Sequence, residues 1–350
     1  MQDLAGGHYE KKCKSNIIQF MAKLSSFNNL NEKQGYFKES DHFIINSKAD
    51  FDVWFDGIVA IKQEERTNYF FRGMKDAKHR LYTSAQRIWI ENDMAEWSGV
   101  SYHGFIDRLI AHSLNHPLLR KVFDVYGYNP AERQFPILSI LQHYGAPTPF
   151  MDWSYNVNVS LFFGTETLKG GHGNDVIDNY FSIYMINKAD YKMELLNIRD
   201  FIEKNIYASF NSFSDWGDDP QNPNKNGIFY ISDFDEGNAY GNIQYSSIQI
   251  RNHRPFTSIF NQNIIPQEGL FIFNPFVLKS IDEVFNVPPH SEGSNLVLTP
   301  FHCFNIKKDL AEYVRRRIKN FQGIDSNFIY PHLYDDTKSI INSTLNSFIV

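Results

Sequence analysis

Apolar residues return every three or four positions in several parts of the chain, which is the spacing of an amphipathic helix. This periodicity predicts helices over residues 47–58, 103–116, 136–144 and 308–321, with a further helix starting near Asp335. Ser47 and Asp50 have the spacing of a capping box at the start of the first helix. Gly145 is a natural stop for the third helix, because Ala-Pro follows it.

Short apolar and aromatic runs, bounded by Asn, Asp, Gly and Pro, indicate β-strands. We expect strands at residues 69–71, 180–186, 227–232, 269–273 and 296–298. The first run leads into Arg72-Gly73, a pair typical of a turn, so the arginine is expected at a strand end. Together the elements predict an α+β fold, with a mixed, mainly antiparallel β core flanked by helices.

The two ends of the chain differ in pattern. Residues 1–45 are polar and irregular apart from an apolar turn at 17–21, and we expect them to form an N-terminal arm. Residues 46–350 are expected to fold as one domain that includes the C-terminal helices. The loop at 211–226 is long enough to be an insertion or a lid.

Composition narrows the class of protein. Aromatic residues make up 16% of the chain, which supplies rigid surface for a core or for stacking a ligand. A formal net charge of -6 and a pI near 6.1 argue against wholesale capture of nucleic acid. The basic strip Arg315-Arg316-Arg317 falls on the last predicted helix, where a solvated helix face is its simplest interpretation.

Cysteine and histidine usage does not indicate a metal site. Cys13 and Cys303 form no CxxC pair, and His112 and His116 lack both an intervening glutamate and a third ligand. No apolar run approaches the ~18 residues that a membrane span needs. The first residues also lack the apolar segment of a secretory signal. We therefore expect a cytoplasmic protein with no membrane partner.

Three separated segments carry the most specific signal in the chain. They are YFFRG at residues 69–73, LQHYGAPTPFMDWS at 141–154 and IIPQEGLF at 264–271. Together they resemble the FRG domain family, which is named for the tripeptide that stands here as Phe71-Arg72-Gly73. The resemblance identifies residues 46–350 as an FRG-type domain.

A weaker match lies further along the chain. Residues 330–333, Tyr-Pro-His-Leu, stand where the family tends to have a Pro-Asp-Leu turn, which extends the resemblance over roughly residues 50–340. Two positions depart from the family pattern. Asn263 stands where an arginine is usual, and His332 stands where an aspartate is common.

A second likeness concerns the order of the motifs. An aromatic strand with Arg-Gly, a later segment with a serine and a later strand headed by Gln-Glu is similar to ADP-ribosyltransferases of the arginine, serine, glutamate type. This resemblance implies an ADP-ribosyltransferase-like architecture with NAD as co-substrate and no metal. A planar guanidinium can hold the NAD pyrophosphate with two donors. A carboxylate can stabilise the oxocarbenium-like state formed when the nicotinamide–ribose bond breaks.

The resemblance also assigns roles to residues. Arg72 would bind phosphate or the nicotinamide ribose, and Ser154 would brace the site. Either Gln267 or Glu268 would bind the ribose hydroxyl and align the nucleophile. The remaining cofactor-binding candidates, with Tyr155 as a further stacking ring, are Gly73, His143, Tyr144, Asp152 and Trp153.

Structural alternatives exist for each of these assignments. Arg72 and Asp152 can instead form a buried ion pair that holds the fold. Gln267-Glu268 can be a turn before a strand. His143 is placed to act as a general base beside Tyr144, or to contact the carbonyls at the end of a helix.

Two functions of different classes are consistent with these residues. The first is an NAD-consuming enzyme that modifies a protein or nucleic-acid target, as a bacterial toxin or phage-defence effector with a neutralising antitoxin partner. The second is a non-catalytic module that recognises a ligand or partner protein. Convergence of Arg72, Ser154 and Glu268 in one cleft would favour the enzyme, and their separation would favour the module.

Overall fold

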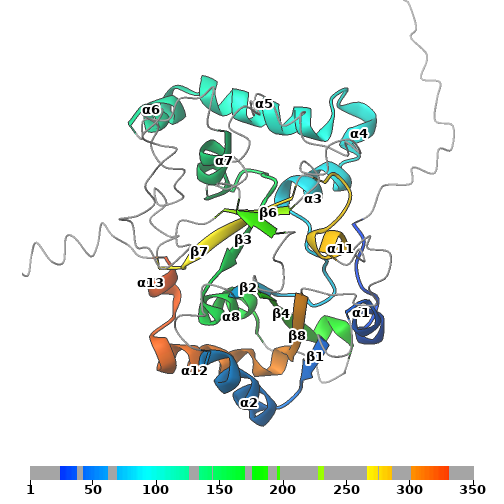
Figure 1. The fold of residues 1–350 in the computed structure, drawn as a ribbon, viewed down its shortest axis with the longest axis vertical. Helices are drawn as coiled ribbons and strands as arrows, with labels where there is room; N and C mark the ends of the chain where they lie inside the picture. Colours follow the sequence, from blue (N-terminus) through cyan, green and yellow to red (C-terminus); the bar gives the residue numbers. More distant parts are fainter. Residues whose placement is uncertain are drawn as a thin grey trace, which may run out of the picture.

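The chain folds as an eight-stranded mixed sheet with helices packed on its faces (Figure 1). The computed structural model describes residues 24–37, 42–61, 69–125, 134–143, 145–169, 176–187, 195–197, 228–231, 266–274, 276–285 and 301–330. The α+β class predicted from the sequence is confirmed. Four predictions lie outside the described residues: the strand at 296–298, the loop at 211–226, the helix near Asp335 and the apolar turn at 17–21.

The sheet is mainly antiparallel, as expected. Its strand order is β1-β8-β4-β2-β3-β7-β6-β5, and only the β1–β8 and β5–β6 pairings among the described strands are parallel. The strands are β1 (His42–Ile45), β2 (Tyr69–Met74), β3 (Phe150–Ser154), β4 (Tyr180–Asn187), β5 (Leu195–Asn197), β6 (Ile228–Ile231), β7 (Gly269–Phe273) and β8 (Phe301–Lys307).

The predicted amphipathic helices form within a few residues of their expected bounds. The helices are α1 (Leu30–Tyr36), α2 (Lys48–Val59), α3 (Ser84–Glu91), α4 (Met94–Trp97), α5 (Tyr102–Asn115), α6 (Pro117–Val125), α7 (Gln134–His143), α8 (Val157–Thr165), α11 (Ile281–Phe285), α12 (Ala311–Gln322) and α13 (Ser326–Ile329). Ser47 begins α2 by accepting a hydrogen bond from the Asp50 amide at 3.2 Å. Gly145, at φ 78°, ends α7 in the left-handed conformation that favours glycine.

Several elements depart from the sequence-based expectation. Helix α8 was not predicted because eight of its nine residues are buried, so no polar face marks its periodicity. Strand β2 continues to Met74, which places Arg72 inside the strand rather than at its end. The segment expected to be an irregular arm contains α1 and β1 in its described part. The division of the chain at residue 45 into arm and domain stays a prediction.

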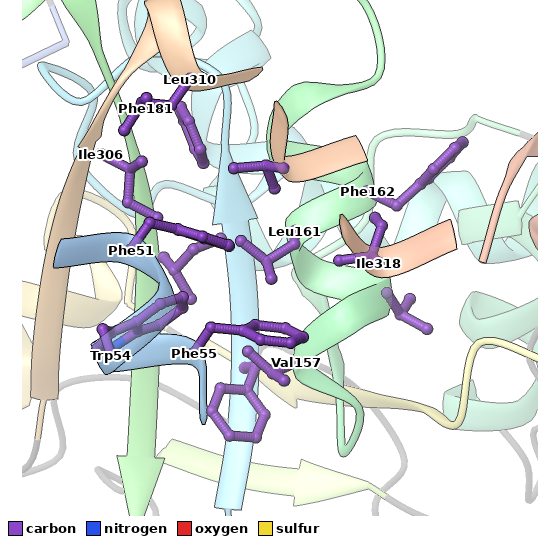
Figure 2. Packing of buried hydrophobic residues seen from close by; sticks show 14 of the residues in the cluster. Phe51, Trp54, Phe55, Val157, Leu161, Phe162, Phe181, Ile306, Leu310 and Ile318 are labelled. Atoms are coloured by element: carbon purple, nitrogen blue, oxygen red, sulfur yellow. The ribbon is translucent and has the colours of Figure 1, made fainter. Parts of the chain in front are cut away.

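One face of the sheet is covered by α2, α8 and α12, which converge on β2, β4 and β8 (Figure 2). Because side chains alternate along a strand, Phe71 of β2 and Phe181 of β4 point to this face. Residues shown in Figure 2 that fill this cluster are Phe51, Trp54, Phe55, Val157, Leu161, Phe162, Ile306, Leu310 and Ile318. This packing fixes the start of α8 and the end of α12, which both reach the candidate site described below.

The opposite face carries a second cluster that spans both halves of the sheet. Phe70 and Tyr184 contribute to it from β2 and β4, and Trp153 and Ile272 contribute from β3 and β7. A third cluster packs α3, α5 and α7 against β3 and β7 on the same face as α8. In Figure 1, α5, α6 and α7 lie at one end of the molecule, and α2 and α12 lie at the other end.

Two of the three arginines in the basic strip hold α12 in place. Arg315 donates to the carbonyl oxygens of Thr165 and Leu168 at the end of α8, the second at 3.1 Å. Arg317 forms an ion pair with Asp56 of α2 at 2.8 Å. The strip lies on a partly solvated helix face, as expected, with Arg316 exposed and with Arg315 and Arg317 half-buried and paired.

Gly73 brings β2 and α8 into direct backbone contact. A Cβ atom at this position would lie 1.9 Å from the Ser160 carbonyl oxygen and 2.7 Å from the Gly164 amide nitrogen. Both atoms belong to the backbone of α8, so neither can turn aside as a side chain would. The glycine of the FRG tripeptide is thus required by packing.

A completely buried lysine joins α1 to the sheet. The Lys33 ammonium donates to the Ala77 carbonyl oxygen at 2.8 Å, to Ser182 Oγ at 2.8 Å and to Asn305 Oδ1 at 2.9 Å. All three acceptors are neutral, and burial lowers the pKa of Lys33 below its ordinary value. The three hydrogen bonds use every donor of the ammonium and offset part of its desolvation.

We expect Gly73→Ala to destabilise the protein by about 3 kcal/mol or more, because backbone atoms must move to admit the methyl group. Gly57→Ala is the matched control, since a Cβ at Gly57 of α2 would meet nothing within 4 Å. The control should stabilise the helix by roughly 0.5 to 1 kcal/mol. Urea unfolding of both variants measures the difference, and equal effects would refute the contact.

Lys33→Met should cost about 1 to 3 kcal/mol at neutral pH, because it leaves buried acceptors without donors. The lowered pKa adds a pH dependence. Between the folded pKa and the ordinary value of 10.5, unfolding takes up a proton, so rising pH stabilises the parent relative to the variant. Urea unfolding of both proteins at several pH values up to 10.5 should show their difference widening. A constant difference would contradict the lowered pKa.

Candidate functional site

The three motif segments lie on adjacent strands in the middle of the sheet. In order across the sheet, β2 carries the FRG tripeptide, β3 ends the second motif and β7 follows Gln267-Glu268. Phe71 pairs with Ser154, and Ser154 pairs with Gly269 on its other side. That first pair is the whole β2–β3 ladder among the described residues, so the two strands diverge beyond it.

Arg72 lies where β2 and β3 diverge. Strand alternation turns its side chain to the face of Phe70, and its Nη1 donates to the carbonyl oxygen of Asp152. The alternative of a side-chain ion pair between Arg72 and Asp152 is therefore wrong for this structure. The Arg72 Nε is buried and has no hydrogen-bond partner among the described residues. Burial lowers the pKa of Arg72 to about 10, the negative charge of Asp152 opposes this shift, and the neighbouring Arg87 adds to it.

The long second motif forms a hydrogen-bonded corner. Thr148 Oγ1 donates to Gln142 Oε1, and Gln142 Nε2 donates to Asp152 Oδ2 at 2.9 Å. The Thr148 amide also donates to Ser84 Oγ of α3 at 3.0 Å. These bonds connect α7, α3 and β3 through residues of a single motif. Its polar side chains are therefore used, at least in part, to hold the corner together.

Ser154 supports the segment before β7. Its hydroxyl donates to the Gln267 carbonyl oxygen at 2.6 Å and accepts from the Asn156 amide at 2.9 Å. Gln267 turns its side chain toward α13, where Nε2 donates to the Ile329 carbonyl oxygen at 3.3 Å. Both residues thus make internal contacts next to the site.

Glu268 has a left-handed backbone, with φ at 44°. This conformation is uncommon for a residue other than glycine and persists where surrounding contacts impose it. Here the Glu268 carbonyl oxygen accepts from the Tyr155 amide at 3.0 Å, while Ser154 holds the preceding carbonyl. The exposed carboxylate accepts from Asn156 Nδ2 at 2.9 Å through Oε1.

Glu268 lines an open recess of about 460 Å³, a volume that includes the space continuous with solvent. Eight of its twelve lining residues are aromatic or aliphatic, and the other four carry an amide or a carboxylate. The lining residues are Ile58, Val59, Ile61, Tyr69, Phe71, Tyr155, Asn156, Val157, Asn158, Glu268, Phe321 and Gln322. No described lysine, arginine or histidine forms an ion pair with the Glu268 carboxylate. The recess therefore combines one carboxylate with aromatic surface.

Three amide side chains beside Glu268 were missed by sequence reasoning. Asn156 Nδ2 donates to Gln322 Oε1 at 3.1 Å as well as to Glu268, and Asn158 Nδ2 donates to the same Gln322 oxygen at 2.8 Å. Asn156 stands two residues after the second motif, and this position beside a motif could have marked it as a candidate site residue. No pattern in the sequence marks Gln322 as a site residue, because it lies 166 positions after Asn156, at the end of α12.

None of the other predicted cofactor-binding side chains that the structure describes lines the recess. Gly73 packs against α8, and Trp153 is buried in the cluster on the Phe70 face. His143 is the last residue of α7, but its side chain, like the whole of Tyr144, lies outside the described residues. Within the described ranges, no three His, Cys, Asp or Glu side chains are grouped to hold a metal ion.

The candidate residues converge only in part. The backbones of the three motifs meet, and Glu268 and Tyr155 share the recess. Ser154 does not line the recess but donates a hydrogen bond to the Gln267 carbonyl next to it. Arg72 does not line the recess either in the part of the chain that the structure describes. The single cleft containing Arg72, Ser154 and Glu268 is thus absent from the described residues.

Comparison with known families agrees with these motifs. Residues 67–171 match the family model of the FRG domain. The matched segment runs from β2 through α8 and includes two of the three motifs, while Gln267-Glu268 lies beyond it. No curated protein and no solved structure matches the chain. None of the helices in the described ranges has the length and apolar character needed to cross a membrane.

We expect Asp152→Asn to change the free energy of unfolding by less than about 0.5 kcal/mol, because its carboxylate is exposed and forms no ion pair among the described residues, so solvent screens its attraction to Arg72. Asp282→Asn is the contrasting variant. The fully buried Asp282 pairs with Arg80 at 3.1 Å and accepts from the Leu81 amide at 2.8 Å. Its substitution should cost about 3 to 5 kcal/mol. Thermal melts of both variants test this, and a large loss for Asp152→Asn would contradict the assigned hydrogen bonds.

Proposed function

We propose that this protein is an ADP-ribosyltransferase-like enzyme that consumes NAD. The observation that carries the proposal is the Glu268 carboxylate, which a left-handed backbone and a hydrogen bond from Asn156 hold beside an aromatic recess. Strained, over-determined residues of this kind concentrate at functional sites. Glu268 is thus the proposed catalytic residue.

The chemistry of the recess suits the nicotinamide end of NAD. The nicotinamide ring of NAD is planar and positively charged, and aromatic faces attract such cations. Four aromatic residues line the recess, namely Tyr69, Phe71, Tyr155 and Phe321. One of these rings already has a cation near it, since the Arg317 guanidinium lies 6.0 Å from the centre of the Phe321 ring. NAD is therefore the proposed co-substrate.

In the proposed reaction, the bond between the nicotinamide nitrogen and the ribose carbon breaks. Its electron pair leaves with nicotinamide, which becomes neutral, and positive charge develops on the ribose. Glu268 stabilises that charge, and an oxygen or nitrogen of the target then bonds to the ribose carbon and loses a proton to solvent. Ser154 and Gln267 act as supports, since both hold the backbone that carries Glu268.

The proposal does not require Arg72 inside the recess. The recess is open to solvent, so the phosphates and adenosine of NAD would extend beyond it. Arg72 turns to the face of Phe70, away from the recess wall at Phe71, and its unpartnered Nε is buried, so Arg72 is assigned no contact with NAD. The target is a protein or nucleic acid. A bacterial toxin or phage-defence role, with a neutralising antitoxin, belongs to the same proposal.

A ligand-binding module without catalysis is the second candidate. Two observations favour it. Arg72, Ser154 and Glu268 share no single cleft among the described residues. Arg72, Ser154 and Gln142 also make internal hydrogen bonds that hold the fold. On that view the recess recognises a ligand and leaves it unchanged. NAD binding without nicotinamide release, with cell lysate present as the source of target, would favour the module over the enzyme.

We expect Glu268→Gln to leave NAD affinity nearly unchanged and to reduce nicotinamide release by roughly 10²-fold or more. The reason is that the carboxylate acts chiefly on charge that develops in the transition state. Isothermal titration calorimetry measures affinity, and nicotinamide release in the presence of lysate measures turnover.

Two further variants accompany this experiment. Gln267→Ala should have a smaller effect, because the Gln267 side chain contacts α13 rather than the recess. Arg72→Lys should leave NAD affinity nearly unchanged, because the Arg72 side chain lies outside the recess and contacts the Asp152 carbonyl instead. The enzyme proposal fails if the parent protein releases no nicotinamide, or if Glu268→Gln releases it at the parental rate.

A further inference from the structure

Asn156 occupies the junction between β3 and α8, and the oxygen and nitrogen of its side-chain amide bind different partners. It is the N-cap of α8, where Oδ1 accepts from the Asn158 amide at 2.9 Å. Nδ2 points the other way and donates to Glu268 Oε1 at 2.9 Å. A single residue thus begins a helix and contacts the carboxylate of the recess.

The capping bond fixes which way the Asn156 amide faces. A backbone N–H can only donate, so the atom that accepts from Asn158 must be the oxygen. The nitrogen is then obliged to face Glu268. Gln322 Oε1 accepts from the same nitrogen at 3.1 Å, which limits rotation of the side chain further.

Glu268 needs such a partner to hold its position. Its side chain is exposed, and Asn156 is its one hydrogen-bond donor among the described residues. An exposed glutamate with several rotatable bonds otherwise samples many rotamers, and fixing one of them costs conformational entropy. Without the Asn156 contact, the carboxylate is free to leave the recess for solvent.

We propose that Asn156 is a positioning residue that fixes the Glu268 carboxylate at the recess. Its effect on turnover rests on the proposed function of Glu268, whereas its effect on carboxylate order does not. The inference predicts that capping and positioning can be separated. Serine and aspartate both cap helices well, but neither has a nitrogen donor for Glu268.

Asn156→Ser keeps the cap and removes the donor. Asn156→Asp also keeps the cap and places a second carboxylate beside Glu268, which adds like-charge repulsion. Both variants should melt close to the parent temperature. Both should reduce kcat for nicotinamide release by roughly 10-fold or more with little change in KM, and aspartate should have the larger effect.

A second measurement does not depend on activity. Side-chain carbon relaxation of Glu268 by NMR should show an ordered carboxylate in the parent and a mobile one in Asn156→Ser. Asn29→Ser is the matched control, because Asn29 caps α1 by accepting from the Glu32 amide, and Glu268 is not among its contacts. The control should change neither carboxylate order nor kcat.

The outcomes separate the inference from the proposed function. An inactive parent with a newly mobile Glu268 in Asn156→Ser refutes the NAD proposal and supports the positioning role. A carboxylate that stays ordered in Asn156→Ser overturns the positioning role, whatever the activity. An active parent whose kcat is unchanged in a variant with a mobile Glu268 overturns it as well.

Discussion

The close approach of β2 to α8 at Gly73 is the constraint on which the candidate site depends. Backbone touches backbone there, with no room for a Cβ atom. This contact sets how deeply α8 lies on the sheet, and α8 begins at Asn156, beside Glu268. Helix α12 is joined to α8 through Arg315, and its last residue, Gln322, accepts from Asn158 Nδ2 of the same helix. A glycine in the family tripeptide thus determines, through packing, where the groups of the recess lie.

The sequence predicted those helices that have one buried face and one exposed face. Helices α2, α5 and α12 have one buried and one exposed face, so their periodicity was visible. Helix α8 is buried almost all round and left no such pattern. Strand β8 was not predicted from the sequence, and the strand expected at 296–298 lies outside the described residues.

The site was predictable in its segments and unpredictable in its side chains. Motif order brought the segments around Arg72, Ser154 and Glu268 together, and they are indeed on adjacent strands. The direction of each side chain depends on strand alternation and on the single pairing between Phe71 and Ser154, which no motif encodes. Gln322 reaches the recess through tertiary packing alone, so it required the structure.

The enclosed amine of Lys33 has a chemical consequence. Acylating reagents attack only an uncharged, accessible amine, and in the folded protein this one is surrounded by its acceptors and by aromatic rings. Labelling of Lys33 therefore requires α1 to separate from the sheet. The rate at which this one lysine becomes acylated, compared with the exposed Lys319, reports how often the N-terminal helix opens.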